Sequence, residues 1–290
     1  MTYRGLLEEG RDVLTRAGID DADSDARILF EHVTEIGRGA LIVRGEEEAT
    51  ERESDTYRLL IEKRCARIPV QHITGRADFM GLTFYVDENV LIPRLDTEYL
   101  VEEMMKEVED GSSVLDVCTG SGCILISLMR YKNGIQGTGC DISGAALEMA
   151  AKNEKAVFDT PGAMSSEQNG LHNPIRWVRS DMFEAVEGEY DYIVSNPPYI
   201  RTDVIETLME EVKDHDPRLA LDGDEDGLKY YRIIAEEAGD HLKRRGRLFL
   251  EIGYDQGEDV RRLLEAQGFR DVQILRDYSG NERVVICSKM

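Results

Sequence analysis

The feature that most constrains this fold is a strand, a glycine-rich turn and a helix in direct succession over residues 113–131. Residues 113–117 form an apolar run of strand length, and residues 123–131 carry apolar side chains at helical spacing. In the turn between them, Gly120 and Gly122 allow a tight backbone and the close approach of a ligand. Strand, glycine turn and helix form the first unit of a doubly wound α/β sheet. We therefore predict an α/β fold with a ligand site at the N-terminus of this helix.

The glycine turn does not match the patterns for dinucleotides or nucleoside triphosphates, because it is neither G-x-G-x-x-G nor a P-loop with its lysine. Asp141 ends the next predicted strand, about 20 residues later, where an acidic residue accepts from ribose hydroxyls. A third predicted strand, residues 175–179, ends just before Asp181 and Met182, which suit the amino group and the ring of adenine. A nucleoside ligand without phosphates fits these features, as S-adenosylmethionine does. The predicted cofactor residues are Cys118, Thr119, Gly120, Ser121, Gly122, Asp141, Asp181, Met182 and Asn196.

Another predicted strand, residues 190–194, ends at Asn196, Pro197, Pro198 and Tyr199. It stops there because the residue before a proline avoids helical space and proline donates no hydrogen bond to a sheet. The Asn196 amide oxygen and the Pro197 carbonyl are two acceptors, and Tyr199 has a flat face. This combination suits a planar NH2 group, and we predict residues 196–199 to be catalytic. The tetrapeptide alone leaves a second interpretation open, in which Asn196 caps local backbone and Tyr199 packs on the core.

Residues 1–75 are predicted to be a helical domain for substrate recognition, because helical patterns recur there without any catalytic constellation. Asp23 or Ser24 is expected to cap its second helix, and a break is expected at residues 37–39. Residues 76–93 are expected to form a β-hairpin or linker, and residues 94–290 the catalytic domain. Phe79 to Val86 alternate like one strand or like a hairpin that turns at Gly81.

Arg94 precedes a helix predicted over residues 97–108 and capped by Asp96 or Thr97. It is either a surface residue or one that faces the cofactor cleft. Residues 159–170 have the composition of a loop. Further helices are predicted at 204–212, 228–242 and 256–267, with a strand at 247–252 and an antiparallel pair at 272–276 and 283–287.

Charge and composition exclude some classes of protein. A formal charge of -23 disfavours direct binding of nucleic acid, whose affinity comes mainly from Lys and Arg at phosphates. The five cysteines are odd in number and form no C-x-x-C pair, so neither a disulfide framework nor a metal site is expected. No apolar run is long enough to span a membrane, and residues 1–6 lack the layout of a signal peptide. We expect a cytoplasmic protein without a membrane partner.

With these motifs in hand, the chain resembles the protein-(glutamine-N5) methyltransferases that modify peptide-chain release factors. The resemblance covers nearly the whole chain. The glycine turn and the Asn-Pro-Pro-Tyr turn are shared with many amino-methyltransferases, whereas the segment Ile-Pro-Arg-Leu-Asp-Thr-Glu and the helical N-terminal domain are far more specific. It is carried by residues 69–75, 91–98, 116–122, 195–199 and 277–283.

The resemblance implies a seven-stranded, mostly parallel Rossmann-like methyltransferase sheet that ends in an antiparallel pair, plus the helical domain. It also implies S-adenosylmethionine as cofactor, contacted by the glycine turn, Asp141, Met182 and Asn196, with residues 196–199 holding the substrate glutamine. The target is the glutamine of the Gly-Gly-Gln motif in bacterial class I release factors. Two departures are noted: Cys118 stands where many relatives have glycine, and the segment 159–170 is longer than usual.

The mechanism expected from these residues is orientation of the target amide and electrostatic pre-organisation, without a metal. The main alternative is an amino-methyltransferase that acts on an adenine or guanine NH2 of nucleic acid through the same turn. A nucleoside-binding regulator without enzymatic activity is the third hypothesis, although it would not need the rigidity of two prolines and a tyrosine.

Overall fold

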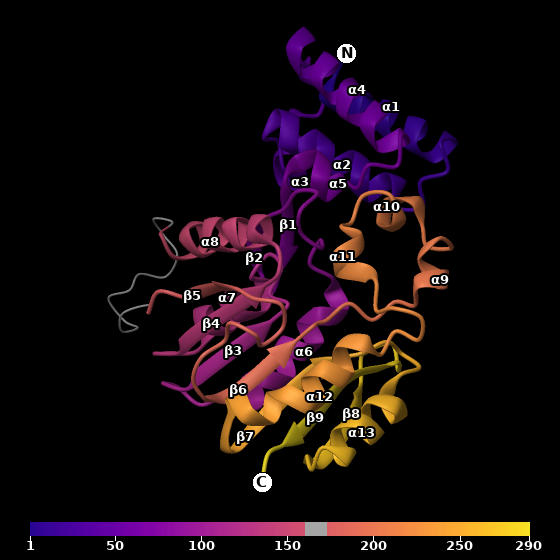
Figure 1. Ribbon diagram of the computed structural model, residues 1–290. Helices are drawn as coiled ribbons and strands as arrows, with labels where there is room; N and C mark the ends of the chain where they lie inside the picture. Colours follow the sequence, from indigo (N-terminus) through magenta and orange to yellow (C-terminus); the bar gives the residue numbers. More distant parts are fainter. Residues whose placement is uncertain (160–172) are drawn as a thin grey trace. The chain divides into compact units, whose positions relative to one another are not determined.

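The computed structural model describes residues 1–159 and 173–290 (Figure 1). The loop predicted at 159–170 therefore lies, after Asp159, outside the described residues. The chain forms two compact units: Met1–Arg76 with Met209–His215, and Ala77–Leu208 with Asp216–Met290. The first unit contains a short segment from far along the chain, which the sequence did not suggest.

The first unit is helical and has its own apolar core, which includes Leu6, Leu29, Phe30, Tyr57 and Ile61. Its elements are α1 (Tyr3–Arg16), α2 (Ala22–Thr34), α3 (Arg38–Arg44), α4 (Glu51–Cys65), α5 (Val70–Thr74) and α10 (Glu210–Lys213).

A buried arginine joins α10 to the helices of this unit. Arg64 donates to Asp25 Oδ2 at 2.7 Å and to Glu211 Oε1 at 3.0 Å, and its side chain is 8% exposed. Because a guanidinium without partners is costly to bury, the two carboxylates stabilise the charge together.

The second unit is an α/β domain. Within its described residues, seven strands form one sheet in the order β5-β4-β3-β6-β7-β9-β8. β3, β4, β5, β6 and β7 pair in parallel, whereas β9 pairs antiparallel with both β7 and β8. This confirms the predicted doubly wound, mostly parallel sheet with an antiparallel C-terminal pair. The strands are β3 (Ser113–Val117), β4 (Gln136–Asp141), β5 (Arg176–Arg179), β6 (Tyr190–Ser195), β7 (Leu242–Glu251), β8 (Arg270–Arg276) and β9 (Glu282–Ser288).

Helices cover both faces of this sheet, as its apolar strands require. Val114, Val194 and Phe249 belong to the core on one face, with α6 (Leu95–Glu107), α7 (Cys123–Tyr131) and α8 (Gly144–Phe158). Their strand neighbours Leu115 and Ile193 belong to the opposite core, with α12 (Lys229–His241) and α13 (Gly257–Ala266). Alternate strand residues thus serve the two cores, which explains why the strands are apolar throughout.

The order of the strands creates a switch point between β3 and β6. From β3 the chain continues outward through β4 and β5, whereas β6 and β7 lie on its other side (Figure 1). In sheets of this kind a crevice opens outside the carboxyl ends of the strands at such a point. The glycine turn follows β3 and the Asn-Pro-Pro-Tyr turn follows β6, so the two motifs are brought together there.

Of the two alternatives predicted for Phe79 to Val86, the structure has the hairpin. Its strands β1 (Arg76–Phe79) and β2 (Leu82–Tyr85) pair with each other and are joined at Met80 and Gly81. The predicted helix at 204–212 is wrong: α9 (Thr202–Ile205) and α10 are separate, and α11 (Arg218–Leu221) follows them. The predicted break at 37–39 is placed too late: the helices are interrupted at residues 35–37, so Gly37 precedes α3 and Gly39 lies inside it.

The expected helix caps are wrong as well. Helix α2 begins at Ala22, so Asp23 lies inside it. The N-cap residue is Asp21, and its side chain makes no capping hydrogen bond. Asp96 and Thr97 lie in the first turn of α6, with Arg94 at the N-cap position. Their side chains make contacts to distant segments instead, and a sequence pattern does not reveal such contacts.

Candidate functional site

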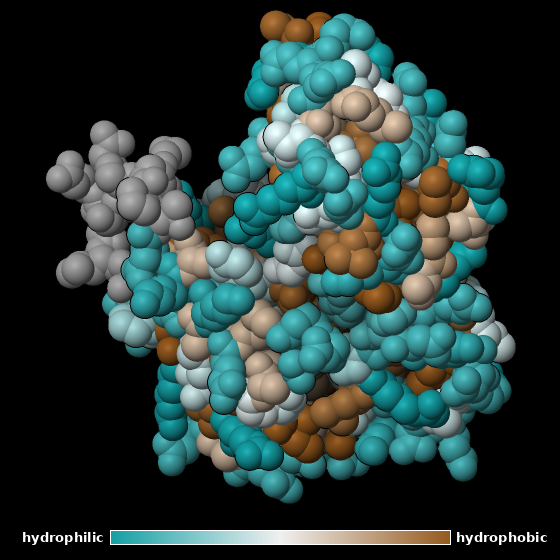
Figure 2. Space-filling model, turned by 90° about the horizontal axis from the view of Figure 1, so that it is seen from above, coloured by the Kyte–Doolittle hydropathy of each residue, from teal (hydrophilic) through white to brown (hydrophobic). Residues whose placement is uncertain are grey.

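A cavity of about 220 Å³ lies within the second unit, at the carboxyl ends of β3, β4, β5 and β6. Most of the predicted site residues line it: Cys118, Thr119, Gly120, Ser121, Asp141, Asp181, Met182, Asn196 and Pro198. Gly122, Pro197 and Tyr199 do not line it. The space-filling view shows a face on which hydrophilic residues predominate and hydrophobic ones form separate patches (Figure 2).

The glycine turn is held by hydrogen bonds of its own. The Thr119 hydroxyl donates to Asp116 Oδ2 at 2.6 Å, and the Gly122 amide donates to the Thr119 carbonyl at 2.9 Å. Cys118, Gly120 and Gly122 all have left-handed backbone, with φ of 60°, 54° and 78°. Cys118 thus has the left-handed backbone that favours glycine, although it carries a side chain.

The two glycines of the turn differ in role. A Cβ atom at Gly120 would meet nothing within 4 Å, so this glycine leaves open space at the cavity wall. A Cβ atom at Gly122 would come within 2.9 Å of Ile126 and 3.0 Å of Trp177, so this glycine permits close packing behind the turn. Gly122 therefore shapes the turn without bordering the cavity.

Asp141 points both of its oxygens at backbone donors. Oδ2 accepts from the Gly120 amide and Oδ1 from the Ser143 amide, each at 2.9 Å. Burial raises the pKa of Asp141, and the two amide donors act against that rise. Each carboxylate oxygen has a second lone pair, so Asp141 retains capacity to accept from a ligand in the cavity.

Asp181 and Met182 border the cavity together, the first exposed and the second buried. Met182 has φ of 47° and its sulfur lies 3.8 Å from Cys118 Sγ. The end of the third predicted strand, β5, therefore lies beside the glycine turn. The interpretation of Asp181 and Met182 as adenine contacts requires this proximity.

Asn196 lines the cavity and is anchored from behind. Its Nδ2 donates to the Thr97 hydroxyl at 3.3 Å, across 99 positions of sequence. The interpretation in which Asn196 caps local backbone is therefore not what the structure has. Tyr199 lies partly buried against the core, and its hydroxyl donates to Glu251 Oε1 at 3.3 Å. The expected tyrosine face at the cavity is not found.

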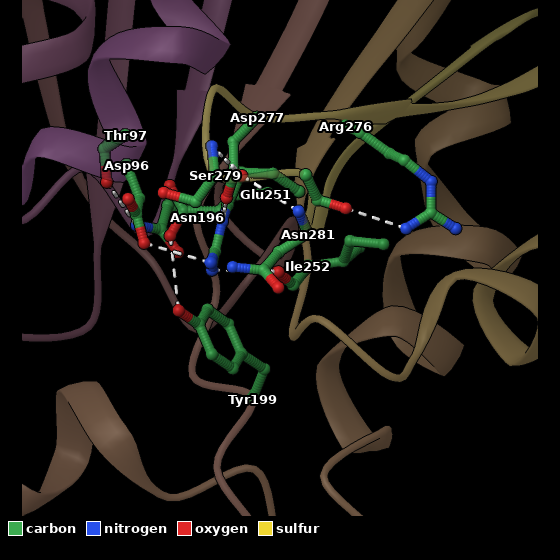
Figure 3. A network of polar contacts seen from close by, with 12 residues as sticks. Asp96, Thr97, Asn196, Tyr199, Glu251, Ile252, Arg276, Asp277, Ser279 and Asn281 are labelled. Atoms are coloured by element: carbon green, nitrogen blue, oxygen red, sulfur yellow. Dashed lines mark hydrogen bonds and ion pairs between the residues drawn. The ribbon is translucent and has the colours of Figure 1, made fainter.

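A network of polar side chains lies behind Asn196 (Figure 3). Arg283 pairs with Asp96 Oδ2 at 2.9 Å and with Asp277 Oδ2 at 3.1 Å, and it is 8% exposed. Glu251 is 2% exposed, and burial raises its pKa to about 7. This network joins residues 96–97, 251 and 277–283, so two of the motif segments quoted above meet in space.

Arg94 is half exposed, lines the cavity and forms an ion pair with the buried Asp216. Of the two alternatives for Arg94, the structure has the one that faces the cleft. The same pair holds the start of the segment 217–220, part of which also borders the cavity.

Comparison with known proteins agrees with this architecture. A family profile described as PrmC N-terminal domain matches residues 5–75, and one described as Methyltransferase small domain matches residues 94–280. A release factor glutamine methyltransferase of Agrobacterium fabrum is 39% identical over 98% of this chain and 96% of that protein. The protein of the same name from Clostridium botulinum is 36% identical, with both chains covered completely. The chain belongs to the release factor glutamine methyltransferase family.

This membership confirms the resemblance stated from the motifs. Among solved structures, a methyltransferase from Pyrococcus furiosus matches 79% of this chain and 98% of its own with a TM-score of 0.51 and 20% identity, which supports the fold alone. Among the described residues, no helix is long and apolar enough to cross a membrane. In that same part of the chain, no group of three His, Cys, Asp or Glu side chains is arranged to hold a metal ion.

Three residues of this release factor glutamine methyltransferase site were missed from the sequence. Asp116 is fully buried under the glycine turn, where burial raises its pKa to about 7 while the Thr119 hydroxyl and the Leu125 amide act against that rise. Glu251 and Thr97 stand behind Asn196. One signal was available: Asp116 and Glu251 are single carboxylates inside apolar strands, and a charge at such a position needs a reason.

Proposed function

We propose that this chain transfers a methyl group from S-adenosylmethionine to the side-chain amide nitrogen, N5, of the glutamine in the Gly-Gly-Gln motif of bacterial class I release factors. One observation carries the proposal: Asn196 and the glycine turn line a single cavity, with Asp141 on the same wall. An acceptor for an amide NH2 group thus stands beside a nucleoside-sized recess. The names of the relatives support the choice of substrate.

The residues that border the cavity fit S-adenosylmethionine, which supplies a methyl group on a positively charged sulfur. Gly120 leaves its side of the wall open, Asp141 and Asp181 are acceptors for hydroxyl and amino groups, and Met182 is apolar. Among the described lining residues Arg94 is the cation, and it is paired with Asp216, so a cluster of phosphate-binding charges is not present there.

The chemical task of the protein is orientation. A carboxamide nitrogen is a poor nucleophile, because its lone pair is delocalised into the carbonyl group. Asn196 Oδ1 would accept from the target NH2, aim its nitrogen at the methyl group and favour the positive charge that develops there. The N–C bond forms as the S–CH3 bond breaks, which leaves a neutral thioether, and the nitrogen then releases one proton to water. The Pro197 carbonyl as second acceptor stays a prediction, since Pro197 does not line the cavity.

The helical unit is the proposed substrate-recognition domain, because all the predicted cofactor residues lie in the second unit. The proposed boundaries are residues 1–75 for this domain, 76–93 for the hairpin linker and 94–290 for the catalytic domain. Since release factors act in translation termination, the proposed compartment is the cytoplasm.

The deciding experiment offers labelled S-adenosylmethionine with intact release factor, tRNA, rRNA and DNA in parallel. We expect label only in the release factor. After digestion of that factor, the label should be in the peptide that contains the Gly-Gly-Gln motif. Label in nucleic acid would instead support the amino-methyltransferase of adenine or guanine. Binding of the cofactor without any transfer would support a nucleoside-binding regulator.

A further inference from the structure

Asn196 ends a short chain of polar side chains that begins at a buried carboxylate. Its Nδ2 contacts Thr97 Oγ1 at 3.3 Å, and Thr97 is 3% exposed in the first turn of α6. Glu251, the last residue of β7, is 2% exposed and accepts from the Tyr199 hydroxyl. Figure 3 shows Thr97, Asn196, Glu251 and Tyr199 gathered at one place. The function proposed above uses Asn196 but assigns nothing to Thr97 or Glu251.

The Thr97 hydroxyl connects the other two groups. It accepts from Asn196 and retains one hydrogen to donate. Its side-chain hydrogen bond with Glu251 comes first among the interactions that lower the pKa of that carboxyl. The buried Glu251 Oε2 has no hydrogen-bond partner among the described residues, so it has the capacity to accept from the hydrogen that the Thr97 hydroxyl retains.

The direction of donation along this chain follows from the carboxylate. An ionised carboxylate only accepts, so Thr97 donates to Glu251 and its lone pair faces Asn196. The group of Asn196 that meets Thr97 must then be the NH2, and the amide oxygen is turned away from Thr97. Packing alone does not select this orientation, because the oxygen and nitrogen of an amide are nearly equal in size.

We propose that Glu251, acting through Thr97, holds the Asn196 amide in the orientation that presents Oδ1 to the substrate NH2. This inference rests on the proposed function. It attributes the specificity of the site for an amino group to two positioning residues, Glu251 and Thr97. In the reversed orientation the Asn196 NH2 would face the substrate NH2, and two donors cannot form a hydrogen bond. Cofactor binding should depend on this orientation only slightly, because the glycine turn, Asp141 and Asp181 still border the cavity.

The protonation state of Glu251 gives the proposal a second readout. Burial raises the pKa of Glu251 to about 7, while Thr97, Arg283 and Tyr199 lower it and Asp96 raises it. A protonated Glu251 is able to donate to Thr97. The Thr97 hydroxyl can then donate to Asn196, so the Asn196 amide oxygen is no longer held facing the cavity. The methylation rate should therefore be lost as the pH falls through about 7. The titratable groups that face Glu251 are Asp96, Tyr199, Tyr231, Cys123 and Arg283.

The test uses two substitutions at one position, T97V and T97S, in the full-length protein. Valine keeps the shape of threonine without the hydroxyl, and serine keeps the hydroxyl. Single-turnover methylation of intact release factor at saturating S-adenosylmethionine measures the chemical step, and calorimetry measures cofactor affinity. T97V should be slower by about 10- to 100-fold, the range found when supporting partners are removed at metal sites. T97S should recover most of that loss, with cofactor affinity unchanged in both.

The control is T83V. The Thr83 hydroxyl donates to a carboxylate as well, that of Asp78 at 2.8 Å, but on the exposed side of the hairpin β1–β2, and neither residue lines the cavity. T83V should methylate at the parent rate. A T97V variant that binds the cofactor and is as fast as T97S overturns the inference, because the hydroxyl then has no role.

E251Q supplies the pH readout. The parent rate should fall below about pH 7, and E251Q should be slow with less dependence on pH, because its amide does not titrate. Asp116 also titrates near 7 but is present in both proteins, so the difference between the two profiles belongs to Glu251. Identical profiles overturn the inference.

Two further outcomes keep the interpretation clear. If E251Q does not fold, the comparison of T97V with T97S decides alone. If the parent protein binds S-adenosylmethionine but methylates no release factor at any pH, the proposed function is wrong and the inference falls with it. An active parent with a fast T97V leaves the proposed function in place and overturns only the positioning role.

Discussion

The two sides of the cavity are built in different ways. On the glycine-turn side, Asp141 is held by amides of the main chain, at Gly120 and Ser143. On the other side, Asn196 is held by the side chain of Thr97, and behind it stands a network drawn from α6, β7 and β9. The first arrangement fixes the proposed ligand-binding group by local backbone geometry. The second fixes the proposed catalytic group by tertiary contacts, so substitutions on the two sides should affect different steps.

The largest expected effect is that of N196A on the chemical step. It removes the acceptor for the target amide and leaves both prolines in place. The loss should be about 3–4 kcal/mol in activation free energy, comparable to the loss of one pre-organised partner in other active sites. Single-turnover methylation at saturating cofactor measures it. Cofactor affinity should change little, and a rate within about threefold of the parent would remove Asn196 from the mechanism.

D141A should have the opposite profile. Ribose hydroxyls lose a charged acceptor, so binding of S-adenosylmethionine should weaken by about 1.5–3 kcal/mol. Calorimetry measures this directly, and D141N is the matched control that keeps the shape and removes the charge. The rate at saturating cofactor should fall less than in N196A. An unchanged dissociation constant in D141A would contradict the role assigned to this side of the cavity.

Each side also has a buried carboxyl whose pKa is raised, and both should make stability depend on pH. Burial raises the pKa of Asp116 and of Glu251 to about 7, from ordinary values near 4. A raised pKa means that the folded state binds the proton more tightly. Stability is therefore greatest below the unfolded-state pKa and is lost as the pH rises through about 7.

The loss from each group should be on the order of 3–4 kcal/mol, spread between about pH 4 and pH 8. Urea unfolding of the parent, D116N and E251Q at a series of pH values measures it. Each substitution should flatten part of the dependence. If both variants keep the full slope of the parent, these carboxyls are not the groups that titrate.

A final comparison, which includes the smallest expected effect, separates the two glycines of the turn. G122A adds a Cβ atom against Ile126 and Trp177 at φ of 78°, so crowding and backbone strain should destabilise the fold by about 2–4 kcal/mol. G120A meets no neighbour within 4 Å and should cost only the strain of its φ of 54°, about 1 kcal/mol. Thermal unfolding measures both. Equal losses would mean that Gly122 has no packing role.

The sequence by itself determined the fold class and the two turns that meet at the cavity. A strand followed by a glycine turn and a helix has few alternatives, and the successive strand ends carry Asp141, Asp181 and Asn196. Parallel strands bring their carboxyl ends to one edge, so these local patterns already imply a common site. The resemblance to release factor methyltransferases rested on the same segments.

Tertiary structure alone decided what lies behind that site. The sequence pattern predicts that Asp96 or Thr97 caps a helix. In the structure Asp96 contacts Arg283 instead, and Thr97 contacts Asn196. Tyr199 was expected at the ligand, yet its hydroxyl meets Glu251, and α10 joins the helical unit through Arg64. The physical reason is the range of the interactions. Turns and strands are set by neighbours in sequence, whereas a buried charge takes whichever partner the fold brings within a few ångströms.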